Sequence, residues 1–166
     1  MTYFRDIHSD DIILSDEFST APVAGGFVLE TQPESNEQFL AALRLSETYF
    51  TKKDLTSKLK LYLTNLKDVV CRRNPELGAA FLAHTASFSK EVLAGFDDYR
   101  FFIGSGGFND AQMVILGKAN EAGLMRFYYF KDGLRAEEAV PGVNPWAEYD
   151  AAVAEREASC AEESEE

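Results

Sequence analysis

The sequence predicts an α+β fold in which helices and strands occupy separate stretches of the chain. Two helical patterns cover residues 51–95, and apolar strands joined by glycine-rich turns follow them up to Phe130. Because the two types are segregated, a mainly antiparallel sheet with an antiparallel helical hairpin is favoured over a parallel, doubly wound sheet. At 166 residues and 46% apolar content, the chain is long enough for one domain with a substantial core.

The N-terminal part of the chain predicts short strands. Residues 1–7 alternate between apolar and polar side chains, as a half-buried strand does, and residues 12–14 and 27–29 are short apolar runs. A polar connection covers Thr31 to Glu37. In residues 39–50 the apolar positions fit both a helix and a strand, so the residue pattern leaves the type of this segment open.

The helical hairpin, residues 51–95, has the clearest local signals. Thr51 followed by Asp54 is typical of a helix N-terminus with a capping side chain, and apolar residues then recur on one face. Asn74 and Pro75 suit the cap and first position of a second helix, and Gly95 suits its end. The short link between the two helices predicts that they are antiparallel.

Three strands are expected after the hairpin, at residues 100–103, 112–116 and 124–130. A glycine-rich loop from Gly104 to Asp110 joins the first two. Beyond Glu137 the composition changes to alanine and glutamate with interspersed proline and glycine. We therefore expect residues 1–138 to form the domain and residues 139–166 to be an acidic tail that is disordered or marginally helical.

Charge and composition exclude several classes of function. A net charge of -12 opposes binding of nucleic acid or of an anionic membrane by the fold as a whole. The sequence has no apolar stretch of membrane-spanning length and no signal-peptide core, which predicts a cytoplasmic protein. Cys71 and Cys160, with two histidines, have no zinc-site spacing and fit a reducing compartment.

The sequence contains no convincing catalytic motif. The loop around Ser105 matches neither a phosphate-binding loop nor a G-x-S-x-G elbow. His84 falls on the apolar stripe of the second helix, where a buried core histidine is expected, and Cys71 beside two arginines lacks an identifiable partner. We predict a non-enzyme. The alternative, a small Cys/His or Ser hydrolase, requires two of these residues within hydrogen-bond reach in an open cleft.

Two charged features are candidate binding surfaces. The acidic residues Asp6, Asp10, Asp11, Asp16 and Glu17 lack EF-hand spacing, but they could contact a basic partner or bind calcium weakly. The alternative is a solvated acidic face.

The second feature is basic. Between Thr51 and Asn74, seven Lys/Arg residues stand against two Asp residues, a local charge of +5. Lys53, Lys60 and Lys67, spaced seven apart, form what we call the basic ridge, which suits an acidic protein surface such as a microtubule. The alternative is a lysine-coated helix face that binds nothing.

Several segments, in the same order along the chain, resemble the translationally controlled tumour protein (TCTP) family. They are YFRDIHSDDIILSD, ETYFTKKDLTSKLKLYL, FDDYRFFIGSGGFNDAQMVIL and FYYFKDGL. The resemblance covers residues 1–138. It implies a β-tent similar to a Rab-GTPase-binding chaperone, with a projecting helical hairpin, and it assigns residues 39–50 to a strand.

The resemblance also implies a function. It predicts a cytosolic interaction protein that binds tubulin and calcium, regulates a Rheb-type small GTPase in growth and survival control, and requires no cofactor beyond weak calcium. The implied GTPase contact is Asp10, Asp11 and Ile12, with Ile12 in place of the family's glutamate. Loss of the GTPase role is the alternative.

The chain also departs from the family in its loop and its tail. The family's long acidic loop is almost absent, and an acidic tail is added, so the chain resembles a divergent member. A further hypothesis has this tail fold over the basic ridge and compete for its partners.

Overall fold

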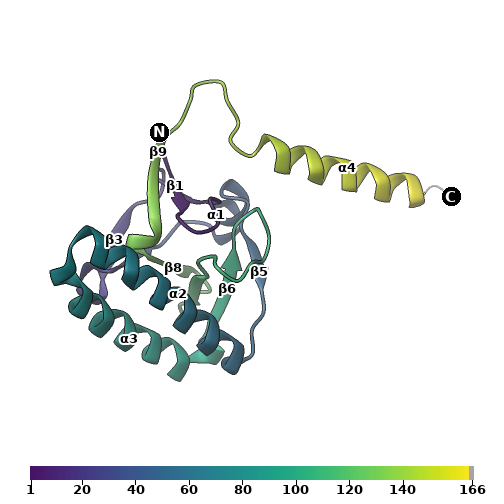
Figure 1. Cartoon of the computed structure of the whole chain (residues 1–166). Coiled ribbons are helices and arrows are strands. Elements are labelled where there is room, and N and C mark those ends of the chain that lie inside the picture. The colour runs from purple at the N-terminus through teal and green to yellow at the C-terminus, as the bar shows by residue number, and fades with distance from the viewer. Residues whose placement is uncertain (165–166) are drawn as a thin grey trace.

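The computed structural model describes residues 1–164, in which two antiparallel sheets and a helical hairpin enclose the core (Figure 1). The first sheet has the strand order β2-β1-β9, with β1 (Thr2–Asp6), β2 (Ile12–Ser15) and β9 (Leu134–Glu138). The second has the order β3-β4-β8-β7-β6-β5, with β3 (Thr20–Val23), β4 (Val28–Thr31), β5 (Ser46–Thr48), β6 (Tyr99–Ile103), β7 (Ile115–Ala119) and β8 (Met125–Phe130).

The helices are α1 (Asn36–Ala42), α2 (Lys52–Arg73), α3 (Gly78–Ala94) and α4 (Ala147–Ser164). Short 3-10 turns cover Ala24–Gly26, Pro75–Leu77, Phe96–Asp98 and Lys131–Gly133. The predicted antiparallel hairpin is α2 and α3, which lie side by side in Figure 1. Within the described residues, none of the helices is long and apolar enough to cross a membrane.

The caps predicted for the hairpin are present. The Thr51 hydroxyl accepts a hydrogen bond from the Asp54 amide at 3.1 Å and so begins α2. Asn74 ends α2 and accepts a hydrogen bond from the Glu76 amide at 3.1 Å, which begins a 3-10 turn before α3. Gly95 follows the last residue of α3. Side-chain caps therefore set the start of α2 and the turn that joins the two helices, whereas α3 itself begins at Gly78 without a side-chain cap.

An aromatic core joins the two sheets and the helices. The rings of Phe39 and Phe127 stack with their centroids 4.3 Å apart, and Phe102 packs edge-on against Phe127. The Tyr129 hydroxyl donates a hydrogen bond to the Ile13 carbonyl at 2.8 Å, which ties β8 of the large sheet to β2 of the small one. Burial of such rings supplies most of the stabilisation expected for a core of this kind.

The assignment of residues 39–50 to a strand is wrong for most of that segment. The Ser35 hydroxyl accepts a hydrogen bond from the Gln38 amide at 3.2 Å and caps α1, which buries Phe39 completely. Arg44 then adopts a left-handed backbone conformation, with φ of 51°, and reverses the chain into the short strand β5. A helix and a strand therefore share the segment, which explains why its apolar spacing fitted both.

One other predicted strand needs correction, and two strands of the structure were missed. The strand expected at residues 112–116 begins only at Ile115, because the Met113 amide donates to the Asp6 carboxylate instead of to a neighbouring strand. Strands β3 and β9 were not predicted. Their side chains are mostly exposed, so they lack the apolar alternation by which strands are found.

Candidate partner-binding surfaces

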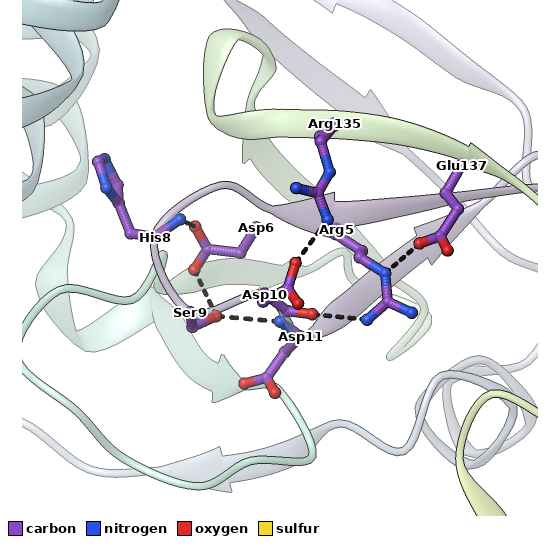
Figure 2. Close-up of polar contacts among 8 residues, drawn as sticks. All are labelled: Arg5, Asp6, His8, Ser9, Asp10, Asp11, Arg135 and Glu137. Carbon is purple, nitrogen blue, oxygen red and sulfur yellow. Dashed lines mark hydrogen bonds and ion pairs between the residues drawn. The ribbon is translucent and has the colours of Figure 1, made fainter.

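The acidic loop, residues 7–11, connects β1 to β2 and presents Asp10 and Asp11. Asp10 lies at its tip with φ of 65°, and 69% of its side chain is exposed. Its carboxylate accepts a hydrogen bond from Arg135 at 2.5 Å, and its carbonyl accepts one from Arg5 at 2.7 Å. Arg5 is in turn paired with Glu137. Figure 2 shows Asp10 between the two arginines, so charged groups from β1 and β9 fix its position.

A buried carboxylate holds the base of this loop. Asp6, which is 1% exposed, accepts hydrogen bonds from the His8 amide at 3.1 Å, the Ser9 hydroxyl at 2.9 Å and the Met113 amide at 2.7 Å. Hydrogen bonds of this kind compensate for the loss of hydration of a buried carboxylate. Asp6 is therefore a structural residue. It was predicted to belong to the acidic surface cluster, but its carboxylate is buried.

Asp11 fits against the glycine-rich loop between β6 and β7. A Cβ atom at Gly106 would lie 2.5 Å from the Asp11 carboxylate, and one at Gly104 would lie 2.7 Å from the Asp11 Cβ. Burial raises the pKa of the Asp11 carboxyl, an effect partly offset by the nearby Gly106 backbone and Ser9 side chain. The two glycines thus form a floor for a carboxylate, a role that their sequence pattern alone did not suggest.

Ile12 does not share this surface. Its side chain is 3% exposed and packs in the hydrophobic core. At this position, which the resemblance assigns to the GTPase contact, the isoleucine side chain is therefore turned away from any partner. The remaining acidic residues of the predicted cluster, Asp16 and Glu17, are exposed at the other end of β2. The acidic loop consequently offers Asp10 and Asp11 alone.

A cleft of about 650 Å³ opens beside the acidic loop. Asp10, Asp11 and Ser105 line one side of it, and residues 143–149 line the other. Figure 2 shows the Asp11 carboxylate pointing away from Arg5 and Arg135. One of its oxygens is buried and has no hydrogen-bond partner among the described residues. The acidic loop therefore combines an exposed carboxylate with a partly buried one.

The basic ridge has a different character. Lys53 and Lys60 are exposed, Lys67 is half-buried, and none of the three takes part in an ion pair within the described residues. Lys58, which the sequence grouped with them, is 7% exposed. Its ammonium donates to the Asn109 carbonyl at 2.5 Å and lies 4.9 Å from the Phe108 ring centroid.

Burial lowers the pKa of Lys58. Lys58 is therefore a packing residue, although it belongs to the same charge run as the ridge.

The residues of the hydrolase alternative do not come together. Within the part of the chain that the structure describes, no hydrogen bond joins any two of Cys71, His84 and Ser105. His84 is exposed and lies beside the Phe27 ring, with centroids 5.7 Å apart, so the prediction that it is buried is wrong. These residues therefore lack the contact between nucleophile and base that such a reaction needs.

Metal binding has little support in the side-chain arrangement. Among the described residues, no three His, Cys, Asp or Glu side chains form a group suited to holding a metal ion. Calcium sites in proteins take six to eight oxygen ligands, several of them carboxylates. Asp10 and Asp11 supply two carboxylates at the acidic loop, and one of these is engaged by Arg135.

Comparison with known proteins identifies the family. The family model described as translationally controlled tumour protein matches residues 29–135. The TCTP homologue of Schizosaccharomyces pombe is 33% identical over 109 residues, which cover 66% of this chain and 65% of that protein. The mouse protein is 28% identical over 172 aligned residues, covering 83% of this chain and 99% of the mouse protein.

Solved structures agree with this assignment. The S. pombe tumour-associated protein p23fyp superposes with a TM-score of 0.71 at 28% identity, covering 84% of this chain and all of that one. The Caenorhabditis elegans TCTP structure superposes with a TM-score of 0.61 at 19% identity and shares the fold. The predicted α+β fold with antiparallel sheets and a helical hairpin is thus confirmed, and the chain belongs to the translationally controlled tumour protein family.

Proposed function

We propose that this chain is a TCTP-like interaction protein whose acidic loop binds a Rheb-type small GTPase in the cytoplasm and promotes nucleotide exchange. The observation that carries the proposal is the fixed presentation of Asp10, whose side chain is 69% exposed, next to Asp11, whose carboxylate is seated against the glycine-rich loop. Carboxylates held in place in this way suit charge-assisted hydrogen bonds to a lysine or arginine of a partner.

The ion pair between Asp10 and Arg135 is compatible with this role. More than half of each side chain is exposed, 69% for Asp10 and 57% for Arg135. Exposed pairs of this kind contribute about 0–1 kcal/mol, so Asp10 can exchange Arg135 for a basic side chain of a partner at little energetic cost. Arg5 holds the Asp10 backbone separately, which leaves the loop in place during such an exchange.

The test is release of fluorescent GDP from a Rheb-type GTPase. We expect the wild-type chain to accelerate release and the double variant Asp10→Ala/Asp11→Ala to lose the acceleration. Asp16→Ala/Glu17→Ala removes the same charge from exposed positions at the other end of β2 and should behave as wild type. No acceleration by the wild type, or an equal loss in both double variants, would refute the proposal.

A second proposed activity is microtubule binding through the basic ridge. The supporting observation is that Lys53 and Lys60 are exposed and that neither is in an ion pair within the described residues. Long-range attraction of this type weakens with salt, because the Debye length falls to about 8 Å at physiological ionic strength.

Co-sedimentation with microtubules tests this second activity. We expect Lys53→Glu/Lys60→Glu/Lys67→Glu to abolish binding at low salt. Charge reversal at three lysines outside the ridge, Lys90, Lys118 and Lys131, changes the net charge equally and should leave most of the binding. Equal losses in the two triple variants would assign the binding to net charge instead of to the ridge.

We propose that calcium binds only weakly, because few carboxylates lie together at the acidic loop among the described residues. Titration calorimetry with calcium checks this point. We expect dissociation constants in the range of about 10⁻⁴–10⁻³ M, as in weak extracellular modules, and loss of the signal in Asp10→Ala/Asp11→Ala. Submicromolar affinity, or an unchanged signal in that variant, would require a different site.

A further inference from the structure

We infer that residues 143–150, which we call the C-terminal strap, dock onto the domain as an intramolecular ligand and shield the acidic loop from a protein partner. The identity of the shielded partner rests on the proposed GTPase role. Docking of the strap onto the domain can be measured without any GTPase. The strap lies outside residues 29–135, the region matched by the family model.

Trp146 anchors the strap. It is 7% exposed, although the acidic segment around it is mostly exposed. Its ring packs edge-on against Tyr3 of β1, with centroids 5.4 Å apart, and the guanidinium carbon of Arg44 lies 4.4 Å from the ring centroid. A buried tryptophan with an aromatic neighbour and an arginine above its face is the kind of anchor that dominates binding interfaces.

Arg44 acts as the receptor for a second contact. Its guanidinium donates to both carboxylate oxygens of Asp150, at 3.2 and 3.0 Å, and to the Ala42 carbonyl at 2.8 Å. One side chain in the turn between α1 and β5 therefore binds Trp146 and Asp150 together. The two strap residues are four apart, and bidentate pairing fixes their orientation as well as their position.

The strap is also organised within itself. The Asn144 side chain accepts a hydrogen bond from the Trp146 amide at 2.9 Å and donates one to the Asp150 carboxylate at 2.9 Å. Arg44 and Asn144 together lower the pKa of Asp150, so the acceptor is ionised at neutral pH. Beyond these contacts α4 extends away from the domain (Figure 1). The predicted fold of the tail over the basic ridge is therefore wrong, because its anchors lie on β1 and beside α1.

The docked strap forms the wall opposite the acidic pair. The cleft between them has a volume of about 650 Å³ and is lined by Asp10 and Asp11 on one side and by the strap, including Glu148, on the other. A cleft of this size admits a small ligand or a side chain. A stable protein interface instead covers about 800 Å² on each partner. Asp10 is 69% exposed with the strap docked, so a GTPase surface can contact it directly, but a surface that also reaches Asp11 inside the cleft must displace the strap.

The contacts permit such displacement. The ion pair between Arg44 and Asp150 leaves 27% and 37% of the two side chains exposed. The connection to β9 includes Gly142 with φ of 78°, a conformation that glycine adopts readily. If the strap is docked about 90% of the time, the affinity of a partner that needs the open form falls about tenfold.

The sole tryptophan of the chain, Trp146, reports the docking in the full-length protein. Asp150→Arg places a positive charge against Arg44, whereas Glu155→Arg makes the same change at an exposed position further along α4. We expect Asp150→Arg to shift tryptophan emission to longer wavelength and to raise acrylamide quenching to that of an exposed indole. Glu155→Arg should match the wild type. An Asp150→Arg spectrum and quenching equal to wild type would overturn the docking.

Binding of the same three proteins to a Rheb-type GTPase tests the shielding. We expect Asp150→Arg to bind about tenfold more tightly than the wild type and Glu155→Arg to be unchanged. If Asp150→Arg exposes Trp146 but binds the GTPase no more tightly, the strap does not shield the loop and the inference is overturned. If none of the proteins binds the GTPase, the proposed function fails, and the fluorescence result alone decides the docking.

Discussion

The acidic loop and the basic ridge both carry concentrated charge, but the fold positions only the charges of the loop. Asp10 is held by arginines from β1 and β9, and Asp11 is seated against Gly104 and Gly106. Lys53 and Lys60 project from α2 without an ion pair among the described residues. A run of like charges in the sequence therefore shows which segment is charged. Whether the fold holds those charged side chains in fixed positions depends on residues from elsewhere in the chain.

Among substitutions that test this difference, we expect the largest loss of stability at Gly106, against which Asp11 is seated. Gly106→Ala places a Cβ atom 2.5 Å from the Asp11 carboxylate and should lower the free energy of unfolding by about 1–3 kcal/mol, as overpacking does. Adding Asp11→Ala removes the clash and should recover part of the loss. Urea denaturation measures both. Gly95→Ala, whose Cβ would have no neighbour closer than 3.6 Å, is the control. Equal losses at positions 106 and 95 would contradict the tight seat.

Within α2 itself, Lys58 and Lys60 provide the next test. Lys58→Ala removes a buried ammonium and its hydrogen bond to the Asn109 carbonyl, so we expect a loss of about 1–2 kcal/mol in unfolding free energy. Lys60→Ala, on the exposed face of the same helix, should change it by less than about 0.5 kcal/mol. Chemical denaturation of the two variants makes the comparison. Similar values would mean that Lys58 is a ridge residue like the others.

The contribution of Asp11 to stability should depend on pH in the direction opposite to that of most carboxylates. Its folded-state pKa is raised, so ionisation disfavours the folded state and stability falls as pH rises from about 4 through that pKa. Asp11→Asn removes the penalty and should be more stable than the wild type at pH 7, by less than about 1 kcal/mol.

This advantage should become small as pH falls below about 4, because folded Asp11 is then protonated and unfolded Asp11 becomes mostly protonated. Thermal unfolding at pH 7 and pH 3.5 measures the difference, with Asp16→Asn as an exposed control. An advantage that is as large at pH 3.5 as at pH 7 would contradict an origin in the Asp11 charge.

Charge reversal across the basic ridge should have the smallest effect on stability. Glutamate at position 53 lies near the positive end of the α2 dipole, where it is favourable, and glutamate at position 67 lies nearer the negative end, where it is not. Position 67 lies more than one turn before the end of α2, so its interaction with the dipole is small, and Lys53→Glu/Lys60→Glu/Lys67→Glu should alter the unfolding free energy by less than about 1 kcal/mol. A larger loss would show that the fold uses these charges.

The parts of the fold that could be predicted from sequence are those fixed by neighbouring residues. Thr51 caps α2, and Asn74 caps the 3-10 turn before α3, through residues three and two positions away, so the sequence contains these signals. The helix and strand of residues 36–48 were not separable. The turn between them depends on the left-handed conformation of Arg44, which no local preference predicts. The exposed strands β3 and β9 exist through pairing with β4 and β1.

The same division applies to the candidate site. Asp10 and Asp11 were identified from the charge pattern and the family resemblance. Their supports, Arg135 and Gly106, are distant in sequence and carry no sign of the role. The burial of Ile12 follows from its place at the start of β2, whose four residues are all buried. Trp146 is the one tryptophan of the acidic tail, and its docking could not be predicted without the position of Arg44.

The pairing of the first strand with the last has a consequence for the order of assembly during synthesis. β1 lies between β2 and β9, and the Thr2 and Glu138 side chains are hydrogen-bonded at 3.1 Å across 136 positions of sequence. The acidic loop follows β1 directly, so it leaves the ribosome before the helical hairpin and the later strands of the domain. Its supports at Met113 and Arg135 emerge near the end of the domain, and long-range pairings of this kind form slowly. A nascent chain can therefore complete its hairpin helices well before it acquires a partner-ready surface.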